Sequence, residues 1–311
     1  MKRKMHRHNL NDTLLGNTRA QGLVISMTAF KILFSVSVLV LLSPVPAHTQ
    51  ESASDKALKA LDDFFKFDVP YIPTPPEVAH AMLTLAGTGP DDVLYDLGSG
   101  DGRIVIAAAR DFGVKKGVGI DLDQELIARA QKTAKREGLS DRADFRVADI
   151  FETDFGDATV LTLYLLEKIN VQLRPRILSD LNPGTRVISH HFNMGDWTPD
   201  AEKIEQQRHI YMWIVPADVS GIWSWSIDDQ DYRLELAQKY QEVSGTLYSP
   251  EGAIELEGVK MRGDTLNFET NLQRNNTYVP ISFEGTSAGN LIKATITINS
   301  QPHSIAAIRT P

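Results

Sequence analysis

A glycine-rich turn bordered by acidic residues is the part of the sequence best suited to chemistry. Residues Asp96–Arg103 follow an apolar run and precede an amphipathic one, with glycines at positions 98, 100 and 102. Glycine permits a tight turn and lets a ligand approach the backbone closely. Because several kinds of nucleotide-binding fold use such a turn between a strand and a helix, the turn alone predicts a ligand site without selecting the ligand.

Three details narrow the choice of ligand. Arg103 stands where the dinucleotide pattern Gly-x-Gly-x-x-Gly needs its third glycine. Asp101 lies at the expected start of the helix, where a pyrophosphate would otherwise bind to backbone N–H groups and would be repelled by a carboxylate. S-adenosylmethionine has no phosphate and carries an ammonium and a sulfonium, and Asp96 is well placed to face that positive end. The turn therefore predicts S-adenosylmethionine as the cofactor.

Two further acidic positions fit the same cofactor. Asp121 ends the next apolar run at about the distance from Asp96 at which an acidic residue accepts hydrogen bonds from ribose hydroxyls. Asp149 and Ile150 follow the third run and could hold the adenine amino group and ring. The alternative is that Asp101 and Asp149 are helix caps or surface acids. The positions predicted here to bind the cofactor are Asp96, Gly98, Ser99, Gly100, Asp101, Gly102, Asp121, Leu122, Asp149 and Ile150.

These positions need a parallel sheet to bring them together. Between residues 77 and 189, short apolar runs alternate with amphipathic helical stretches, which is typical of β-α-β units and predicts a Rossmann-like, doubly wound sheet. An antiparallel pair near 204–215 closes it. After Pro216 short alternating strands are separated by turn signals. We expect residues 69–216 to form the α/β domain and 217–311 a small meander barrel or sandwich of about eight strands. Trp223 and Trp225 are expected to plug its core or to line a ligand mouth.

The α/β segment resembles the class I, seven-strand methyltransferases. Val93–Ile104 is similar to their first motif, and Gly117–Asp123 to their acidic second-strand motif. Pro70–Pro75, Thr162–Leu166 and Gly184–His190 resemble the subgroup that methylates lysines of the ATP synthase c-subunit and the adenine nucleotide translocase. The resemblance covers about residues 68–200 and none of the predicted barrel.

This resemblance implies further site residues. Tyr71 and Thr74 would lie over the cofactor, and Tyr164 with Leu165 would line the methyl-acceptor side. A lysine acceptor must be neutral to attack, and burial between aromatic rings favours that form. Tyr164 and His190 are therefore the candidate catalytic residues, with His191 as an alternative base. A structural role for both histidines is the competing interpretation. With no cysteine in the chain there is no Cys–zinc site and no thiol nucleophile, and we expect no metal site.

The N-terminus predicts export. Basic residues up to Arg19 precede an apolar run at 32–42 and a Val-Pro-Ala segment at 45–47, which is typical of a secretory signal cleaved after Ala47. Translation from Met27 would give a more ordinary signal. An uncleaved anchor is the alternative, and it would give membrane association, although Lys31 interrupts its apolar run. We expect a periplasmic, secreted or anchored protein, with residues 48–68 as a leader.

The net charge of the chain limits the class of molecule that it could methylate. The chain has a net charge of −8, and residues 48–311, with 26 basic and 39 acidic side chains, have −13. Nucleic-acid binding relies on Lys and Arg at phosphates, so we expect a protein or a small molecule as acceptor and no nucleic acid. The sequence thus predicts a methyltransferase, with protein lysine as one candidate acceptor. The alternative is an exported binding protein that keeps the fold and uses its β domain for docking. The two differ in whether they transfer methyl groups.

Overall fold

The computed structural model describes residues 71–274 and 277–310. The predicted signal or anchor (1–47) and the leader (48–68) lie outside the described residues, and both stay predictions. Within the described part of the chain, no helix combines the length and apolar character that crossing a membrane requires.

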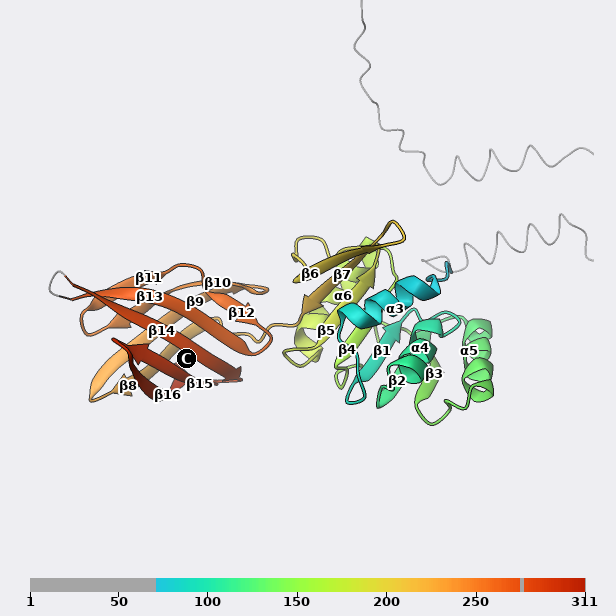
Figure 1. The fold of residues 1–311 in the computed structure, drawn as a ribbon, viewed down its shortest axis with the longest axis horizontal. Helices are drawn as coiled ribbons and strands as arrows, with labels where there is room; N and C mark the ends of the chain where they lie inside the picture. Colours follow the sequence, from blue (N-terminus) through green and yellow to red (C-terminus); the bar gives the residue numbers. More distant parts are fainter. Residues whose placement is uncertain (1–70, 275–276, 311) are drawn as a thin grey trace, which may run out of the picture. The chain divides into compact units, whose positions relative to one another are not determined.

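One sheet of seven strands organises the α/β region, in the order β3-β2-β1-β4-β5-β7-β6 (Figure 1). The first five strands run parallel, and β7 lies antiparallel between β5 and β6. The predicted doubly wound sheet with a closing antiparallel pair is confirmed. The strands are β1 (Val93–Leu97), β2 (Lys116–Asp121), β3 (Ala143–Val147), β4 (Val160–Leu163), β5 (Arg186–His190), β6 (Ala201–Glu205) and β7 (Arg208–Ile214).

Helices cover both faces of this sheet. Apolar residues of α3, α4 and α5 form one core with residues of β1, β4, β5 and β7. Apolar residues of α6 form a second core with the opposite faces of β1, β2, β4 and β5. The central strands are buried on both faces, which explains their nearly continuous apolar sequence. The helices are α3 (Pro76–Leu85), α4 (Arg103–Asp111), α5 (Gln124–Arg136) and α6 (Glu167–Asp180).

Local sequence signals set the bounds of the helices beside the site. Pro76 occupies the first turn of α3, where its missing N–H costs no hydrogen bond. Asp123 caps α5 by accepting hydrogen bonds from the N–H groups of Glu125 and Leu126. Gly138 has a φ of +69° beyond the end of α5, where a left-handed residue usually ends a helix. Asp123 therefore fixes where α5 begins after β2, and the parallel pairing of β1 with β2 brings the end of β2 beside the glycine turn.

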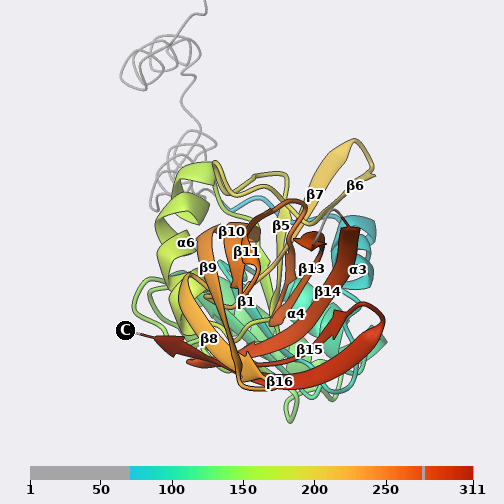
Figure 2. The same cartoon turned by 90° about the vertical axis from the view of Figure 1, so that its left-hand side faces the viewer.

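The β region is a closed eight-strand meander, so the predicted barrel is confirmed and the sandwich is not found. Strands that neighbour one another in the ring pair antiparallel, and the pairing of β16 with β8 closes the ring (Figure 2). The short strands β11 and β12 pair with different parts of β10 and together occupy one of the eight positions. The strands are β8 (Gly221–Ile227), β9 (Gln230–Lys239), β10 (Glu242–Ser249), β11 (Gly252–Leu256), β12 (Lys260–Arg262), β13 (Thr265–Arg274), β14 (Thr277–Ala288), β15 (Leu291–Ile298) and β16 (Gln301–Thr310).

The two barrel tryptophans have different surroundings. Trp223 is fully buried and donates a hydrogen bond from Nε1 to the carbonyl of Val219 at 2.8 Å, so it packs as part of the core. Trp225 stacks on Tyr232, and its buried Nε1 has no hydrogen-bond partner among the described residues. It lines a hollow of about 480 Å³ together with Ser224, Ser226, Asp231, Tyr232, Arg233, Tyr248 and Ser249.

Candidate functional site

The glycine turn has the backbone that the sequence predicts. Gly98, Gly100 and Gly102 have φ values of +80°, +54° and +78°, in the left-handed region that glycine enters at little cost. The N–H groups of Gly98 and Ser99 both donate to the carbonyl of Ile120, at 2.8 and 2.9 Å. The turn between β1 and α4 is thereby fixed to the end of β2.

Side chains approach these glycines so closely that larger residues would not fit. A Cβ at Gly100 would lie 2.5 Å from Cε2 of Tyr71, and a Cβ at Gly98 would lie 2.7 Å from Cδ2 of Leu165. A Cβ at Gly102 would clash with the ring of Phe145. The turn is therefore a cradle that only glycine permits, with Tyr71 directly over its middle.

Asp96 is a buried carboxyl at the end of β1. Its side chain is almost completely buried, and Oδ1 accepts a hydrogen bond from Oγ1 of Thr162 on β4 at 2.7 Å. Burial raises the pKa of Asp96 to about 7, against the opposing effect of the Thr162 hydrogen bond. The nearby carboxylates of Asp121 and Asp101 raise it further. A cation placed beside Asp96 would favour its ionised form, which suits the predicted positive ligand.

Asp121 lies at the end of β2, next to the turn. Its carboxylate accepts hydrogen bonds from the N–H groups of Gly100 and Asp123, each at 2.8 Å. Burial raises the pKa of Asp121, and these two hydrogen bonds oppose the shift. Its carbonyl accepts from the N–H of Ala148 at 3.1 Å, which holds the loop carrying Asp149 beside it.

The residues predicted for the nucleoside side are accessible on that edge. Leu122 is 51% exposed, while Asp149 and Ile150 are half-buried. Oδ1 of Asp149 accepts a hydrogen bond from the N–H of Phe151 at 2.8 Å, so Asp149 shapes its own loop. The next helix begins only at Glu167, so Asp149 is not a helix cap.

Asp101 forms an ion pair with Arg103 that we did not predict from the sequence. Nε and Nη2 of Arg103 donate to the two oxygens of Asp101 at 2.8 and 2.6 Å. Burial alone would raise the pKa of Asp101, but the hydrogen bonds and charge of Arg103 outweigh it and hold that pKa below its ordinary value. Asp101 is thus ionised at the start of α4, and its charge is balanced by the guanidinium of Arg103.

His190, Tyr164 and Thr74 meet on the acceptor side. Thr74 Oγ1 lies 3.0 Å from Nδ1 of His190, and both side chains are buried. The ring of Tyr164 stacks on that of His190 with centroids 3.8 Å apart, and Phe192 lies 6.3 Å from Tyr164. Burial lowers the pKa of His190 to about 4, with a smaller contribution from the charge of Arg208. His190 is therefore neutral near pH 7, and His191 is exposed.

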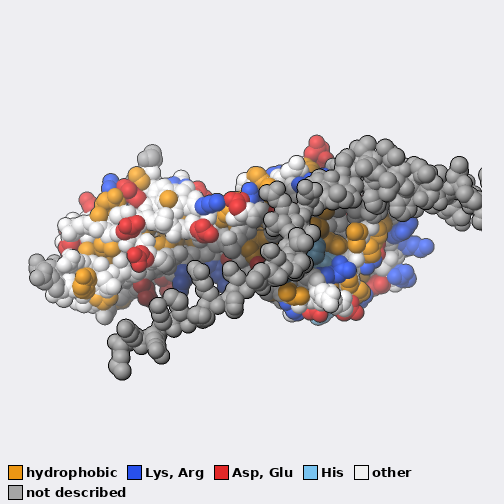
Figure 3. Space-filling model, turned by 90° about the horizontal axis from the view of Figure 1, so that it is seen from above, with side chains coloured by type: hydrophobic (Ala, Val, Ile, Leu, Met, Phe, Trp, Pro, Cys, Tyr) orange, Lys and Arg blue, Asp and Glu red, His pale blue; other side chains and the backbone are white. Residues whose placement is uncertain are grey.

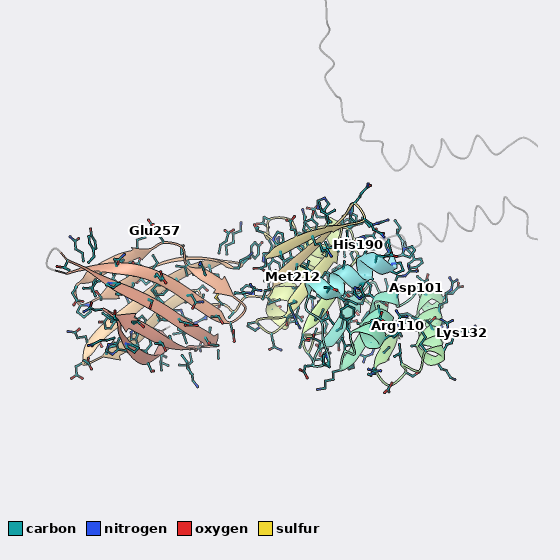
Figure 4. All side chains as sticks on the ribbon, in the orientation of Figure 1. Asp101, Arg110, Lys132, His190, Met212 and Glu257 are labelled. Atoms are coloured by element: carbon teal, nitrogen blue, oxygen red, sulfur yellow. The ribbon has the colours of Figure 1, made fainter. Side chains whose placement is uncertain are left out.

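The predicted residues thus gather at one edge of the sheet, where β1, β2, β4 and β5 end. Figure 4 labels Asp101 and His190 near α3, the helix that directly follows the segment Tyr71–Thr74. The sequence analysis used Arg103 only as the residue that replaces the third glycine of the dinucleotide pattern, and it gave Thr162 no role in the site. The ion pair could have been predicted, because Arg103 follows Asp101 by only two residues at the start of a helix.

Basic side chains gather elsewhere. Figure 3 shows Lys and Arg around α5, which exposes Arg129, Lys132, Lys135 and Arg136. Glu125 and Glu137 pair with Arg129 and Arg136, so part of this charge is neutralised. Within residues 71–274 and 277–310, no group of three or more His, Asp or Glu side chains is arranged to hold a metal ion.

The donor set fits S-adenosylmethionine. The turn leaves no room for a Cβ, and the Oγ of Ser99 is buried without a partner among the described residues. The carboxyl group of Asp96 is buried at the end of β1, and that of Asp121 is half-buried at the end of β2. Carboxyl groups and backbone suit a cationic nucleoside and oppose a pyrophosphate.

Known proteins share this region. The family pattern of the ANTKMT methyltransferase domain matches residues 96–201. A protein-lysine N-methyltransferase of Saccharolobus islandicus is 42% identical over 151 residues, which are 47% of this chain and 94% of that protein. A lysine N-methyltransferase of Xenopus laevis, named for the c-subunit of ATP synthase, is 33% identical over 137 residues, 43% of this chain and 58% of that protein.

A crystal structure described as an RNA methyltransferase from Salinibacter ruber, in complex with S-adenosyl-L-homocysteine, is 49% identical, with a TM-score of 0.47. The match covers 48% of this chain and 96% of that one. The family pattern ends at residue 201, before the barrel strands of Figure 1 begin.

Proposed function

The chain belongs to the class I S-adenosylmethionine-dependent methyltransferases, and on that premise we propose that it methylates a lysine side chain of a protein. Two kinds of support favour lysine. The Saccharolobus and Xenopus relatives are named for that activity. The carrying observation in this chain is the pair of half-buried rings of Tyr164 and Phe192 beside the glycine cradle, with the buried, neutral ring of His190 stacked on Tyr164.

The proposed cofactor-binding residues follow from the cradle. The turn from Gly98 to Gly102 would receive the cofactor against its backbone, Asp96 would face its positive end, and Asp121 would accept from the ribose hydroxyls. When bound, S-adenosylmethionine supplies a methyl group on an already activated leaving group. The chain's own work is therefore to orient the acceptor and to help it lose a proton.

On the acceptor side, neutral aromatic groups would help a lysine to lose its proton. A lysine ammonium loses its proton more readily when water is excluded, because desolvation penalises the charged form. Tyr164 and Phe192 offer apolar ring surface for this. His190 adds a ring that carries no charge above about pH 5 and so would not repel an incoming ammonium.

Labelled methyl transfer tests the proposal. The purified full chain would be incubated with methyl-tritiated S-adenosylmethionine and cell extract, and the product divided between protease and nuclease digestion. We expect label in the protein fraction, recovered after hydrolysis as methylated lysine. Label recovered only in nucleosides, or in small molecules, would overturn the lysine assignment. Cofactor binding without any transfer would favour the alternative, an exported binding protein.

We also propose that the protein is exported or membrane-anchored, supported by the basic head and apolar run before Ala47. Fractionation and N-terminal sequencing of the natural protein test this. A chain beginning at His48 outside the cytoplasm is the expected result for a cleaved signal. A full-length chain in the cytosolic fraction would contradict export.

A further inference from the structure

The segment Tyr71–Thr74, here named the strap, is held at two points by side chains from elsewhere in the chain. It precedes α3 and passes over the glycine turn, where the ring of Tyr71 lies close to Gly100. The strap has no regular secondary structure, and its first three residues are exposed, Tyr71 by 44% and Ile72 by 50%. Its position therefore depends on contacts made by its polar groups.

Arg103 makes the first anchor. Its Nη1 donates to the carbonyl of Thr74 at 2.9 Å, and its Nη2 lies 3.4 Å from the hydroxyl of Tyr71. The same guanidinium is oriented by the two hydrogen bonds to Asp101. One side chain thus joins the turn to both ends of the strap, which only a planar group with several fixed donors can do.

His190 makes the second anchor. Its Nδ1 pairs with the hydroxyl of Thr74, and its ring stacks on Tyr164. Thr74 and His190 are 116 residues apart in sequence, so this contact connects the strap to the end of β5 and to the acceptor-side ring. The buried His190 has no exposed surface from which to meet a substrate.

We propose that Arg103 and His190 are positioning residues that hold the strap as a common support for the two sides of the site. Arg103 fixes the strap over the cofactor cradle, and His190 transmits its position to Tyr164. The part concerning Tyr164 rests on the proposed function, whereas the Arg103 part rests on the contacts of the turn alone. The low pKa of His190 agrees with a supporting role and not with that of a base near pH 7.

Cofactor affinity tests the first anchor. Arg103→Met and Arg103→Lys would be compared with the unchanged chain by calorimetric titration with S-adenosylmethionine. We expect the Kd to rise about tenfold or more in both variants, because charged hydrogen bonds are lost and a lysine cannot replace the fork. Arg110→Met is the matched control, since Arg110 lies on the same helix and pairs with Asp111 and Glu137 at the surface. Its Kd should not change.

Hydrogen exchange of the strap provides a readout without cofactor. Arg103→Met should speed exchange in the peptide covering residues 71–74, and Arg110→Met should not. Faster exchange with an unchanged Kd would overturn the proposal, since the strap would then support nothing. Unchanged exchange would overturn it as well. If the chain without substitutions binds no S-adenosylmethionine, the cofactor assignment is contradicted instead. The hydrogen-exchange comparison would then still test whether Arg103 holds the strap.

Thr74 tests the second anchor with an isosteric pair. Thr74→Val removes the hydroxyl that His190 contacts, and Thr74→Ser keeps it. With labelled transfer into extract protein as the probe, we expect Thr74→Val to lower the rate about tenfold with little change in cofactor Kd, and Thr74→Ser to restore most of it. The pH profile of the rate should keep its shape. A lost inflection in Thr74→Val would identify His190 as a base, and equal rates in all three chains would remove the second anchor.

Discussion

The carboxyl edge of the α/β sheet and the interior of the barrel bury very different side chains. Among the described residues, the buried polar and charged groups lie almost all in the α/β region, and the barrel contributes only Ser287. The barrel interior is filled by aliphatic and aromatic residues from all around its ring. Most of the buried polar and charged groups lie at or beside the carboxyl edge of the sheet, whereas Asp92 and Thr185 lie at the amino ends of β1 and β5. Because burying polar groups costs stability unless they are paired, the group at the carboxyl edge is the candidate for chemistry.

The comparison also bears on the alternative of a binding protein that works through its β domain. A barrel that held a ligand inside would need space there, and this interior is packed around Trp223 and Phe283. The hollow beside Trp225 is lined by side chains near the ends of β8, β9 and β10. The middle of the barrel is thus packed, and the hollow lies at the strand ends beside Trp225 and Tyr232.

Trp223→Ala should give the largest effect on stability. Removing a fully buried tryptophan from the barrel core should lower the free energy of unfolding by about 3–5 kcal/mol. Urea unfolding measures this loss, and calorimetry on the folded protein should show an unchanged Kd for S-adenosylmethionine. A Kd that rises in proportion would mean that the two regions do not divide stability and chemistry as described.

Gly100→Ala should mainly lower cofactor affinity, whereas Trp223→Ala should mainly lower stability. The new Cβ would meet the ring of Tyr71, and φ is left-handed, so we expect cofactor affinity to fall about 100-fold, roughly 2.7 kcal/mol. Gly289→Ala is the control in the barrel, because its φ is also positive but no atom lies within 4 Å of the added Cβ. It should cost about 1–2 kcal/mol of stability and leave the Kd unchanged. Equal affinity in both variants would contradict the cradle.

Asp121→Ala should weaken cofactor binding by about 1–3 kcal/mol through lost hydrogen bonds. Part of this loss arises because the N–H groups of Gly100 and Asp123 lose their acceptor. Calorimetry gives the affinity, with Asp144→Ala, an exposed acid on β3, as the control. An unaltered Kd in Asp121→Ala would mean that the ribose binds elsewhere.

The smallest predicted effect depends on pH. Burial gives Asp96 a pKa of about 7 in the free chain, with Asp121 and Asp101 as the neighbouring charges. A bound cation requires the ionised carboxylate, so binding must remove a proton below that pH. We expect affinity to be level above about pH 7 and to fall by up to about tenfold per pH unit below it. Asp96→Asn should bind more weakly at high pH and lose this dependence. A persisting dependence in Asp96→Asn would assign the proton to another group.

The sequence was a good guide to elements and a poor guide to long-range contacts. The strand Val93–Leu97 ends at the glycine turn, as an apolar run followed by such a turn predicts. A barrel and a sandwich could not be distinguished, since closure depends on β16 meeting β8, far apart in sequence. The signals that end each strand are local, whereas the register that closes a ring is not.

The same limit applies to the site. Asp96 and Asp121 could be placed beside the turn because parallel strands end at one edge of a sheet. The pairing of Arg103 with the carbonyl of Thr74, and of Thr74 with His190, joins positions 29 and 116 residues apart. No local pattern encodes those contacts. From the sequence, His190 could be predicted as a base or as a structural residue, and its buried contact with Thr74 is seen only in the structure.

Competitive titration of the full chain tests the central claim most directly. S-adenosylmethionine, S-adenosylhomocysteine and NAD⁺ would be titrated into the same preparation, with Gly100→Ala as the matched variant. We predict saturable binding of the first two, lost in the variant, and no displacement by NAD⁺, because Asp96 and Asp121 lie beside the turn and Arg103 replaces the third glycine of the dinucleotide pattern. Binding of NAD⁺ with displacement of S-adenosylmethionine, or failure of both nucleosides to bind, would contradict the account.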